Sequence, residues 1–265
     1  MYDFIYQRAD SVDDACAKYS AAADARYLAG GMTLVPVLKQ RLDQPSDIVD
    51  LGFLDDLRGI SEDGDSIVVK AMTTHNMINT SGLVKDKIPA LAALAATIGD
   101  QMVRNRGTIG GNLANNDPAA SYPCSVLALN ATIKTDKREI GADDFFLGMF
   151  DTALEEGEMI TAVSFPIPEQ AGYEHFPNPA SRFPIVGAFV AKGTDGVRVA
   201  ITGAGPCAFR QNDFETAMPN KLDAEAIQDI HISDSGLNSD IHASAEYRAH
   251  LINVMTRRAI AKAMG

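Results

Sequence analysis

The residues best suited to chemistry form a glycine-rich stretch from Ile98 to Pro123. It holds few bulky apolar side chains, and glycines in such a stretch let a ligand approach the main chain closely. The stretch contains Gly107, Gly110 and Gly111. It also contains five short polar side chains, those of Thr108, Asn112, Asn115, Asn116 and Ser121. Backbone N–H groups beside hydroxyls and amides make a good cradle for phosphate. The stretch therefore favours binding of a phosphorylated ligand.

A second glycine loop, from Tyr27 to Leu34, lies upstream. It follows a predicted short strand and precedes a predicted helix from Leu34 to Leu42. That placement sets helix-start amides and a partial positive charge beside the Gly30-Gly31 turn. Two such loops could grip the two phosphates of a dinucleotide from opposite sides. Either loop alone can be an ordinary turn, because glycine is a common turn residue.

The formal net charge of −12 disfavours a nucleic-acid partner, since phosphate backbones need a basic face. An acidic protein that binds an anionic dinucleotide must do so with local amides and a few local cations. Arg104 and Arg106 precede the second loop. They can neutralise phosphate, anchor the loop through carbonyl oxygens, or contact a partner subunit, and the sequence does not choose among these roles.

We expect no metal site in this chain. Cys16, Cys124 and Cys207 are far apart, and neither they nor the five histidines show metal-ligand spacing. The cysteines are predicted to be small buried hydrophobes and the histidines to lie at the surface or in packing roles. A Gly-x-Ser-x-Gly elbow is absent, and Pro206 after Gly203-Ala204-Gly205 argues against a Rossmann site.

The pattern of elements predicts an α+β protein. Residues 1–57 read as a β-α-β-α-β unit, and residues 58–168 as hairpins at 60–71 and 131–140 with several helices, one from Pro118 to Leu127. Residues 166–179 are predicted to be a linker. After it come strands at 185–192 and 197–202 and helices at 223–230 and 244–263. No segment is apolar enough to span a bilayer or direct export, so we expect a cytoplasmic protein.

Five segments in this order resemble the FAD-binding medium subunit of the molybdenum hydroxylases, which include carbon monoxide dehydrogenase and the xanthine dehydrogenases. They are AGGMTLVPVLKQRL, IGDQMVRNRGTIGGNLANNDPAA, DDFFLGMFDTALEEGEMI, ASRFPIVGAFVA and YRAHLINVMTRRAI. The resemblance covers nearly the whole chain. It implies a two-subdomain FAD-binding fold of the vanillyl-alcohol-oxidase/PCMH type over residues 1–168 (subdomains 1–57 and 58–168), and a C-terminal α+β domain, an antiparallel sheet with helices, over 171–265.

The resemblance also implies which residues bind FAD. Two sets would surround the pyrophosphate: Leu28, Ala29, Gly30, Gly31, Met32, Thr33 and Leu34 from the first loop, and Thr108, Ile109, Gly110, Gly111 and Asn112 from the second. Others would contact the rest of the cofactor: Ile98, Asp117, Ser121, Ile160 and Phe183, the last covering the isoalloxazine face. Three departures from the family pattern are Met32 for a polar residue, Asn115-Asn116-Asp117 for a His-containing segment, and Ser121 for an acidic residue.

By this resemblance, a molybdenum-cofactor large subunit oxidises the substrate and a [2Fe–2S] small subunit relays electrons. The FAD of this chain passes them to an external electron acceptor, with the redox chemistry supplied by the cofactor and no catalytic side chain required. The departures leave an alternative, a non-catalytic assembly module of such a complex. A stand-alone flavin oxidoreductase is a third possibility.

Overall fold

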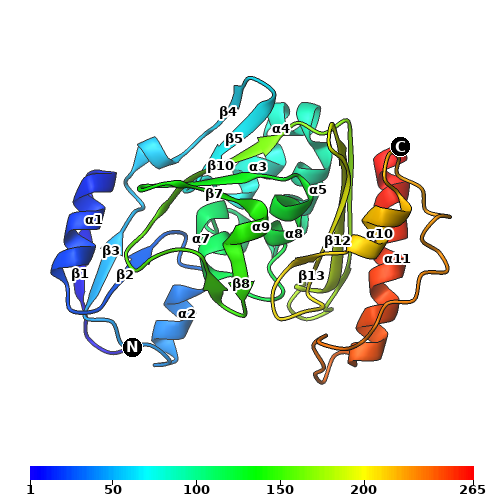
Figure 1. Ribbon diagram of the computed structural model, residues 1–265. Helices are drawn as coiled ribbons and strands as arrows, with labels where there is room; N and C mark the ends of the chain where they lie inside the picture. The colour runs from blue at the N-terminus through cyan, green and yellow to red at the C-terminus, as the bar shows by residue number, and fades with distance from the viewer.

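The first sheet of the computed structural model, which describes residues 1–265, is parallel with strand order β1-β3-β2 (Figure 1). Its strands and connecting helices are β1 (Ile5–Arg8), α1 (Val12–Ala21), β2 (Ala25–Leu28), α2 (Leu34–Lys39) and β3 (Asp47–Asp50). The predicted β-α-β-α-β unit is confirmed. Ser11 caps α1 by accepting a hydrogen bond from the Asp14 amide at 3.0 Å. The first glycine loop follows β2 and precedes α2, as the sequence predicts.

The second sheet has five strands in the order β4-β5-β10-β6-β7. Its strands are β4 (Ile60–Asp63), β5 (Ser66–Lys70), β6 (Thr132–Thr135), β7 (Glu139–Gly141) and β10 (Ile160–Pro166). The remaining elements of this region are a 3-10 turn (Asp55–Leu57), α3 (His75–Thr80), α4 (Gly82–Lys87), α5 (Pro89–Thr97), α6 (Gln101–Arg104), α7 (Ile109–Asn115), α8 (Tyr122–Ala128), α9 (Ala142–Phe145), β8 (Phe146–Gly148) and β9 (Asp151–Thr152). Both predicted hairpins are confirmed.

The helix predicted to begin at Pro118 begins instead at Tyr122. The Asp117 carboxylate accepts a hydrogen bond from the Ala119 amide at 2.8 Å, and the Ala120 amide donates to the Asp117 carbonyl at 2.8 Å. These bonds close a turn that competes with helix, a known tendency of aspartate.

The third sheet is antiparallel with the order β11-β12-β13-β14. Its elements and the helices after it are β11 (Gln170–Pro177), β12 (Pro184–Gly193), β13 (Gly196–Thr202), β14 (Phe209–Arg210), α10 (Asn212–Ala217) and α11 (Ala245–Met264). The predicted linker at 166–179 is wrong, because β11 pairs with β12 from Gln170 to Pro177. Its prolines sit at the ends of strands, where a missing N–H does little harm.

Two other C-terminal predictions have opposite outcomes. The helix predicted at 223–230 is wrong, because the segment forms turns: the Gln228 and Ile230 amides donate to carbonyls three residues back, those of Glu225 and Ile227, at 3.3 and 3.2 Å. The helix predicted at 244–263 is confirmed as α11, capped by Ser244, which accepts from the Tyr247 amide at 3.2 Å.

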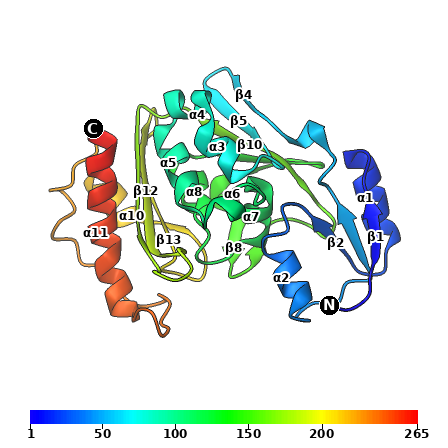
Figure 2. The same cartoon turned by 180° about the vertical axis from the view of Figure 1, so that it is seen from behind.

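Helices cover both faces of the third sheet, α11 on the outside and α5 and α8 on the inside (Figures 1 and 2). The largest apolar core, of 32 residues, joins the second sheet and these inner helices to Tyr173 and Phe189 of the third sheet. The third sheet is therefore fixed against the region that carries the glycine-rich stretch. None of the helices combines the length and hydrophobicity that a membrane span requires.

The close contact of β11 with α11 depends on Gly172. A Cβ atom there would lie 2.0 Å from the Ala259 carbonyl oxygen, so we expect Gly172→Ala to lower the free energy of unfolding by about 3 kcal/mol, at the upper end of typical overpacking costs. Urea denaturation measures this. Gly193→Ala is the matched control, because a Cβ at Gly193 meets nothing within 4 Å. Equal stabilities of the two variants would contradict the prediction.

Candidate functional site

The two glycine loops touch each other, backbone against backbone. A Cβ on Gly30 would lie 2.0 Å from the carbonyl oxygen of Arg106 and 2.8 Å from Cα of Gly107. Gly31 has φ +76°, a left-handed conformation that other residues rarely adopt. The two segments, more than seventy residues apart in the sequence, therefore form one continuous wall.

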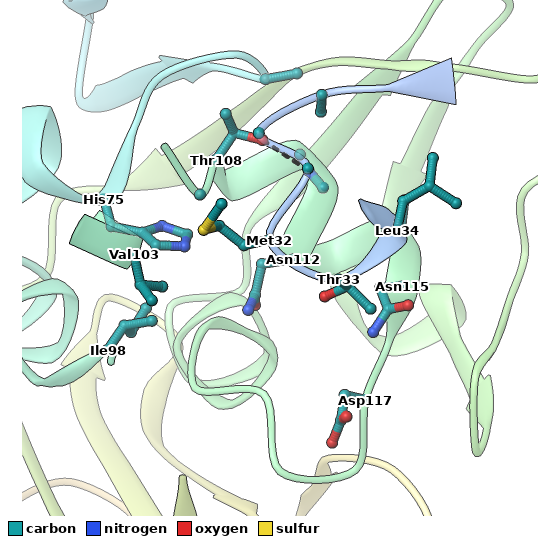
Figure 3. Close-up of a pocket in the computed structure, with 18 of the residues that line it drawn as sticks. Met32, Thr33, Leu34, His75, Ile98, Val103, Thr108, Asn112, Asn115 and Asp117 are labelled. Atoms are coloured by element: carbon teal, nitrogen blue, oxygen red, sulfur yellow. Dashed lines mark hydrogen bonds between the residues drawn. The ribbon is translucent and has the colours of Figure 1, made fainter. Parts of the chain in front are cut away.

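That wall borders a cavity of about 600 Å³ (Figure 3). It brings together most of the residues predicted from sequence: Ala29, Gly30, Gly31, Met32, Thr33, Leu34, Ile98, Thr108, Gly110, Gly111, Asn112, Asp117, Ser121, Ile160 and Phe183. Leu28 and Ile109 are not among its lining residues. Leu28 lies beneath Gly31, its Cδ1 atom 3.4 Å from the position of a Cβ there, and Ile109 is fully buried in the core.

The backbone donors come mainly from the first loop. The amides of Ala29 through Thr33 have no hydrogen-bond partner within the protein, because α2 begins only at Leu34. In the second loop, the amides of Ile109 and Gly110 donate to Thr73 and Ala71 carbonyls at 3.1 and 2.9 Å. The Gly111 amide donates to Thr108 Oγ1 at 3.2 Å. The sequence predicts a run of available amides in both loops. The structure has such a run in the first loop only.

The structure chooses among the roles left open for Arg104. Its guanidinium donates to the carbonyls of Ile98 and Gly99 at 3.1 and 2.9 Å, so Arg104 anchors the loop. Neither Arg104 nor Arg106 lines the cavity. The arginines that do are Arg26, paired with Asp24 and Asp43, and Arg182, which donates to the Gly99 carbonyl at 3.1 Å. An anion in the cavity would be met chiefly by amides.

The cavity has two chemically different ends. One lies beside the first sheet, where the Tyr27 hydroxyl donates to the Gly157 carbonyl at 3.0 Å and Glu158 lines the wall. Arg138 donates to both oxygens of Glu158 at 3.0 Å, and these hydrogen bonds lower the pKa of that carboxyl to about 2. The Glu158 carboxylate is therefore ionised near pH 7, and its hydrogen bonds with Arg138 give it a structural role.

The other end is mostly apolar. Ile98, Gly99 and Val103 line it, and the connection between β11 and β12 reaches it through the Arg182–Gly99 hydrogen bond. Phe183, on that connection, is 49% exposed and lines the cavity. Packing of the third sheet on the second through their shared core thus places Phe183 near the glycine-rich stretch.

His75 is a cavity-lining residue that sequence reasoning placed only in a surface or packing role. It is 4% exposed, its amide donates to the Gly107 carbonyl at 3.0 Å, and its Nδ1 atom has no partner. Burial, with a smaller effect of Arg104, lowers its pKa to about 4. Arg26, Tyr27, Val103 and Arg182 were also missed, because no local pattern marks a residue that reaches a cavity through tertiary packing.

The three cysteines differ in burial. Cys124 is fully buried, as predicted, but Cys16 and Cys207 are only partly buried, so the prediction is wrong for these two. Cys16, on α1, packs against the core cluster of the first sheet, and its sulfur lies 3.4 Å from the Asp136 carboxylate. No group of three or more potential metal-ligating side chains gathers anywhere in the structure.

A cavity walled by two glycine loops, one of which has a run of amides without protein partners, suits a dinucleotide in an α+β protein. Residues 2–168 match the family model described as the FAD binding domain in molybdopterin dehydrogenase. The chain is 35% identical to the nicotine 6-hydroxylase medium subunit of Paenarthrobacter nicotinovorans, over 97% of this chain and 96% of that protein. It is 32% identical to the carbon monoxide dehydrogenase medium chain of Hydrogenophaga pseudoflava, with coverage of 97% and 96%.

Solved structures agree. A chain of carbon monoxide dehydrogenase from Hydrogenophaga pseudoflava matches with a TM-score of 0.92 and 33% identity, covering 99% of this chain and 98% of that one. Quinoline 2-oxidoreductase from Pseudomonas putida 86 matches with a TM-score of 0.89 and 31% identity, covering 99% and 97%. The chain therefore belongs to the FAD-binding medium subunits of the molybdenum hydroxylases. It is an oxidoreductase component with FAD as its cofactor, and the resemblance and the α+β FAD-binding fold are confirmed.

The residues present fit FAD. A cavity of about 600 Å³ is within the range of small-molecule and cofactor sites. Five partnerless amides suit a diphosphate, and Asn112 offers a buried Oδ1 atom that has no partner in the protein. Met32, 42% exposed at the wall, supplies its amide and no polar side chain.

Replacing Gly30 tests the contact between the loops. Gly30→Ala places a methyl group against the Arg106 carbonyl and must push the loops apart, so we expect FAD affinity to fall at least tenfold, about 1.4 kcal/mol. Fluorescence titration of the apoprotein with FAD measures the dissociation constant. Gly82→Ala is the control, since a Cβ at Gly82 meets no atom within 4 Å. Unchanged affinity in Gly30→Ala would show that the contact does not shape the cradle.

His75 should make stability depend on pH. Its folded-state pKa of about 4 lies below the ordinary value of 6.5, so the unfolded chain binds the proton more readily. The contribution of neutral His75 to the free energy of unfolding is present above pH 6.5 and is lost as the pH falls toward about 4. The loss is about 1.4 kcal/mol at pH 5.5. Urea unfolding of wild type and His75→Gln across this range measures it, with exposed His231→Gln as control. Parallel pH profiles for wild type and His75→Gln would contradict the prediction.

Proposed function

We propose that this chain is the electron-transfer subunit of a molybdenum hydroxylase complex. Its FAD would receive electrons from [2Fe–2S] clusters on a small subunit, after a molybdenum-cofactor large subunit has oxidised the substrate, and deliver them to an external acceptor. The observation that carries the proposal is the amide-lined cavity in a chain matched along nearly its whole length by medium subunits. Bound FAD supplies the redox chemistry, and the protein binds and orients it.

In this proposal, the first loop does most of the binding. The amides of Ala29 to Thr33 donate to the diphosphate, while Thr108, Gly110 and Gly111 keep the second loop close behind it. Leu28 and Ile109 support the two loops from below, without lining the cavity. The remaining proposed FAD-binding residues are Leu34, Ile98, Asn112, Asp117, Ser121, Ile160 and Phe183.

The flavin ring is assigned to the Phe183 end of the cavity. Arg182 fixes the Phe183 loop to Gly99, and the half-exposed phenyl ring brings this end close to the surface. Electrons must enter and leave there, so a surface position suits a carrier. Adenine then lies at the Tyr27 and Ile160 end.

We further propose that residues 1–168 form the FAD-binding domain, with subdomains 1–57 and 58–168, and that residues 171–265 form the C-terminal domain of a cytoplasmic subunit. The hydrophobic core shared between the second and third sheets supports cooperative unfolding of 58–168 with the C-terminal domain. A smaller core cluster lies mostly within the first subdomain and also takes in Met72 and Met159 of the second.

Affinity purification of the tagged chain from its native source tests the assignment. We expect two further polypeptides, molybdenum by elemental analysis, and [2Fe–2S] signals by electron paramagnetic resonance. In the isolated complex, dithionite-reduced clusters should reduce an acceptor dye in wild type. A complex assembled with the Gly30→Ala chain, and shown by its absorbance to contain no FAD, should keep its reducible clusters and lose dye reduction.

The outcomes separate the alternatives. Equal dye reduction by the two complexes would favour the assembly module, because the FAD would then be dispensable. Efficient turnover of an organic substrate by the purified chain with FAD alone would favour a stand-alone oxidoreductase. Either result would refute the proposed electron-transfer role.

A further inference from the structure

His75 is a buried polar side chain on the cavity wall for which the proposed function gives no role. It begins α3, directly after Thr74, whose side chain accepts a hydrogen bond from the Met77 amide at 3.3 Å. Thr74 also pairs with Thr108 in an isolated β-bridge. The backbone at His75 is therefore fixed against the second glycine loop, and this fixes where the side chain begins.

The imidazole is held at the apolar end of the cavity. In Figure 3 it points into the cavity from the side of Val103 and Ile98, toward Met32. A Cβ on Gly107 would lie 2.5 Å from its Nε2 atom, so the glycine leaves the space that the ring occupies. Tyr122 packs on the other side, with ring centroids 5.3 Å apart.

The surroundings also select a protonation state and a tautomer. Desolvation, assisted by the charge of Arg104, lowers the pKa of His75 to about 4, so the ring is neutral near pH 7. Nδ1 is buried and has no hydrogen-bond partner. A buried N–H without a partner is rarer in proteins than an under-satisfied acceptor, so the proton belongs on Nε2. The side chain thus presents one neutral N–H donor at the wall.

We propose that His75 contacts the cofactor directly, donating a hydrogen bond from Nε2 to a carbonyl oxygen or to N1 of the flavin ring system, the acceptors that gain negative charge on reduction. The inference rests on the proposed placement of the ring at the Phe183 end. A fixed donor beside atoms that gain negative charge on reduction stabilises the reduced cofactor. His75 therefore both orients the ring and raises its midpoint potential.

Three substitutions at this position separate hydrogen bonding from packing. His75→Gln can place an amide nitrogen near the Nε2 position, His75→Asn near the Nδ1 position, and His75→Leu fills similar space without a donor. We expect His75→Leu and His75→Asn to bind FAD about tenfold more weakly, with a lower midpoint potential and a shifted flavin absorbance band. His75→Gln should restore most of the wild-type values.

Tyr122→Phe is the control. Tyr122 packs beside His75 but does not line the cavity, and its buried hydroxyl has no hydrogen-bond partner. Removing this hydroxyl should therefore leave FAD affinity, midpoint potential and flavin absorbance at wild-type values. The measurements are FAD titration and spectroelectrochemistry of the full chain. Equal values for His75→Gln and His75→Leu would refute the proposed hydrogen bond.

Two further outcomes are informative. Weaker FAD binding with unchanged absorbance and potential would place His75 against another part of the cofactor and overturn the assignment. Wild-type protein that binds FAD, but whose dye reduction in the complex is independent of FAD, would refute the proposed function and leave the His75 contact standing. The two claims can therefore fail separately.

Discussion

The site depends on one backbone contact, Gly30 against the carbonyl of Arg106 and Cα of Gly107. It joins a loop of the parallel sheet to a loop of the helical region, and no side chain fits between them. The second loop directs its own amides inward, to Thr73 and Ala71, and so becomes a rigid base. The first loop, which contacts that base, keeps a row of amides available. In the proposed function these amides bind the diphosphate, and a strongly acidic protein needs no dedicated cation for it.

The two ends of the cavity are formed by different sheets. The parallel sheet supplies Tyr27 at one end, while the third sheet, fixed through the shared core, supplies Phe183 at the other. Arg104 and Arg182 both donate to the Gly99 carbonyl, so two cations stabilise the turn between α5 and α6. Residues from the regions of all three sheets therefore line one cavity.

Local patterns predicted much of the fold. Alternation and turn residues identified the strands of the first two sheets, and the helix predicted at 244–263 is confirmed as α11. The failures have physical causes. β11 reads as a linker because Gly172 and its flanking prolines lower strand propensity, although pairing with β12 and packing on α11 override it. The 223–230 segment is not a helix, because the Gln228 and Ile230 amides bond three residues back and form separate turns.

For the site, the glycine loops could be predicted because backbone exposure requires specific residue types at fixed spacing. The direction of each amide could not, since it depends on partners such as Thr73 that lie elsewhere in the chain. His75 escaped notice for a similar reason: its sequence neighbours say nothing about Gly107 leaving space for its ring.

Hydrogen–deuterium exchange of the chain with and without FAD tests the central claim most directly. The account predicts that the amides of Ala29 to Thr33 become strongly protected on binding, while those of Ile109 and Gly110, already bonded within the protein, change little. Protection confined to the second loop, or absent from both, would contradict it.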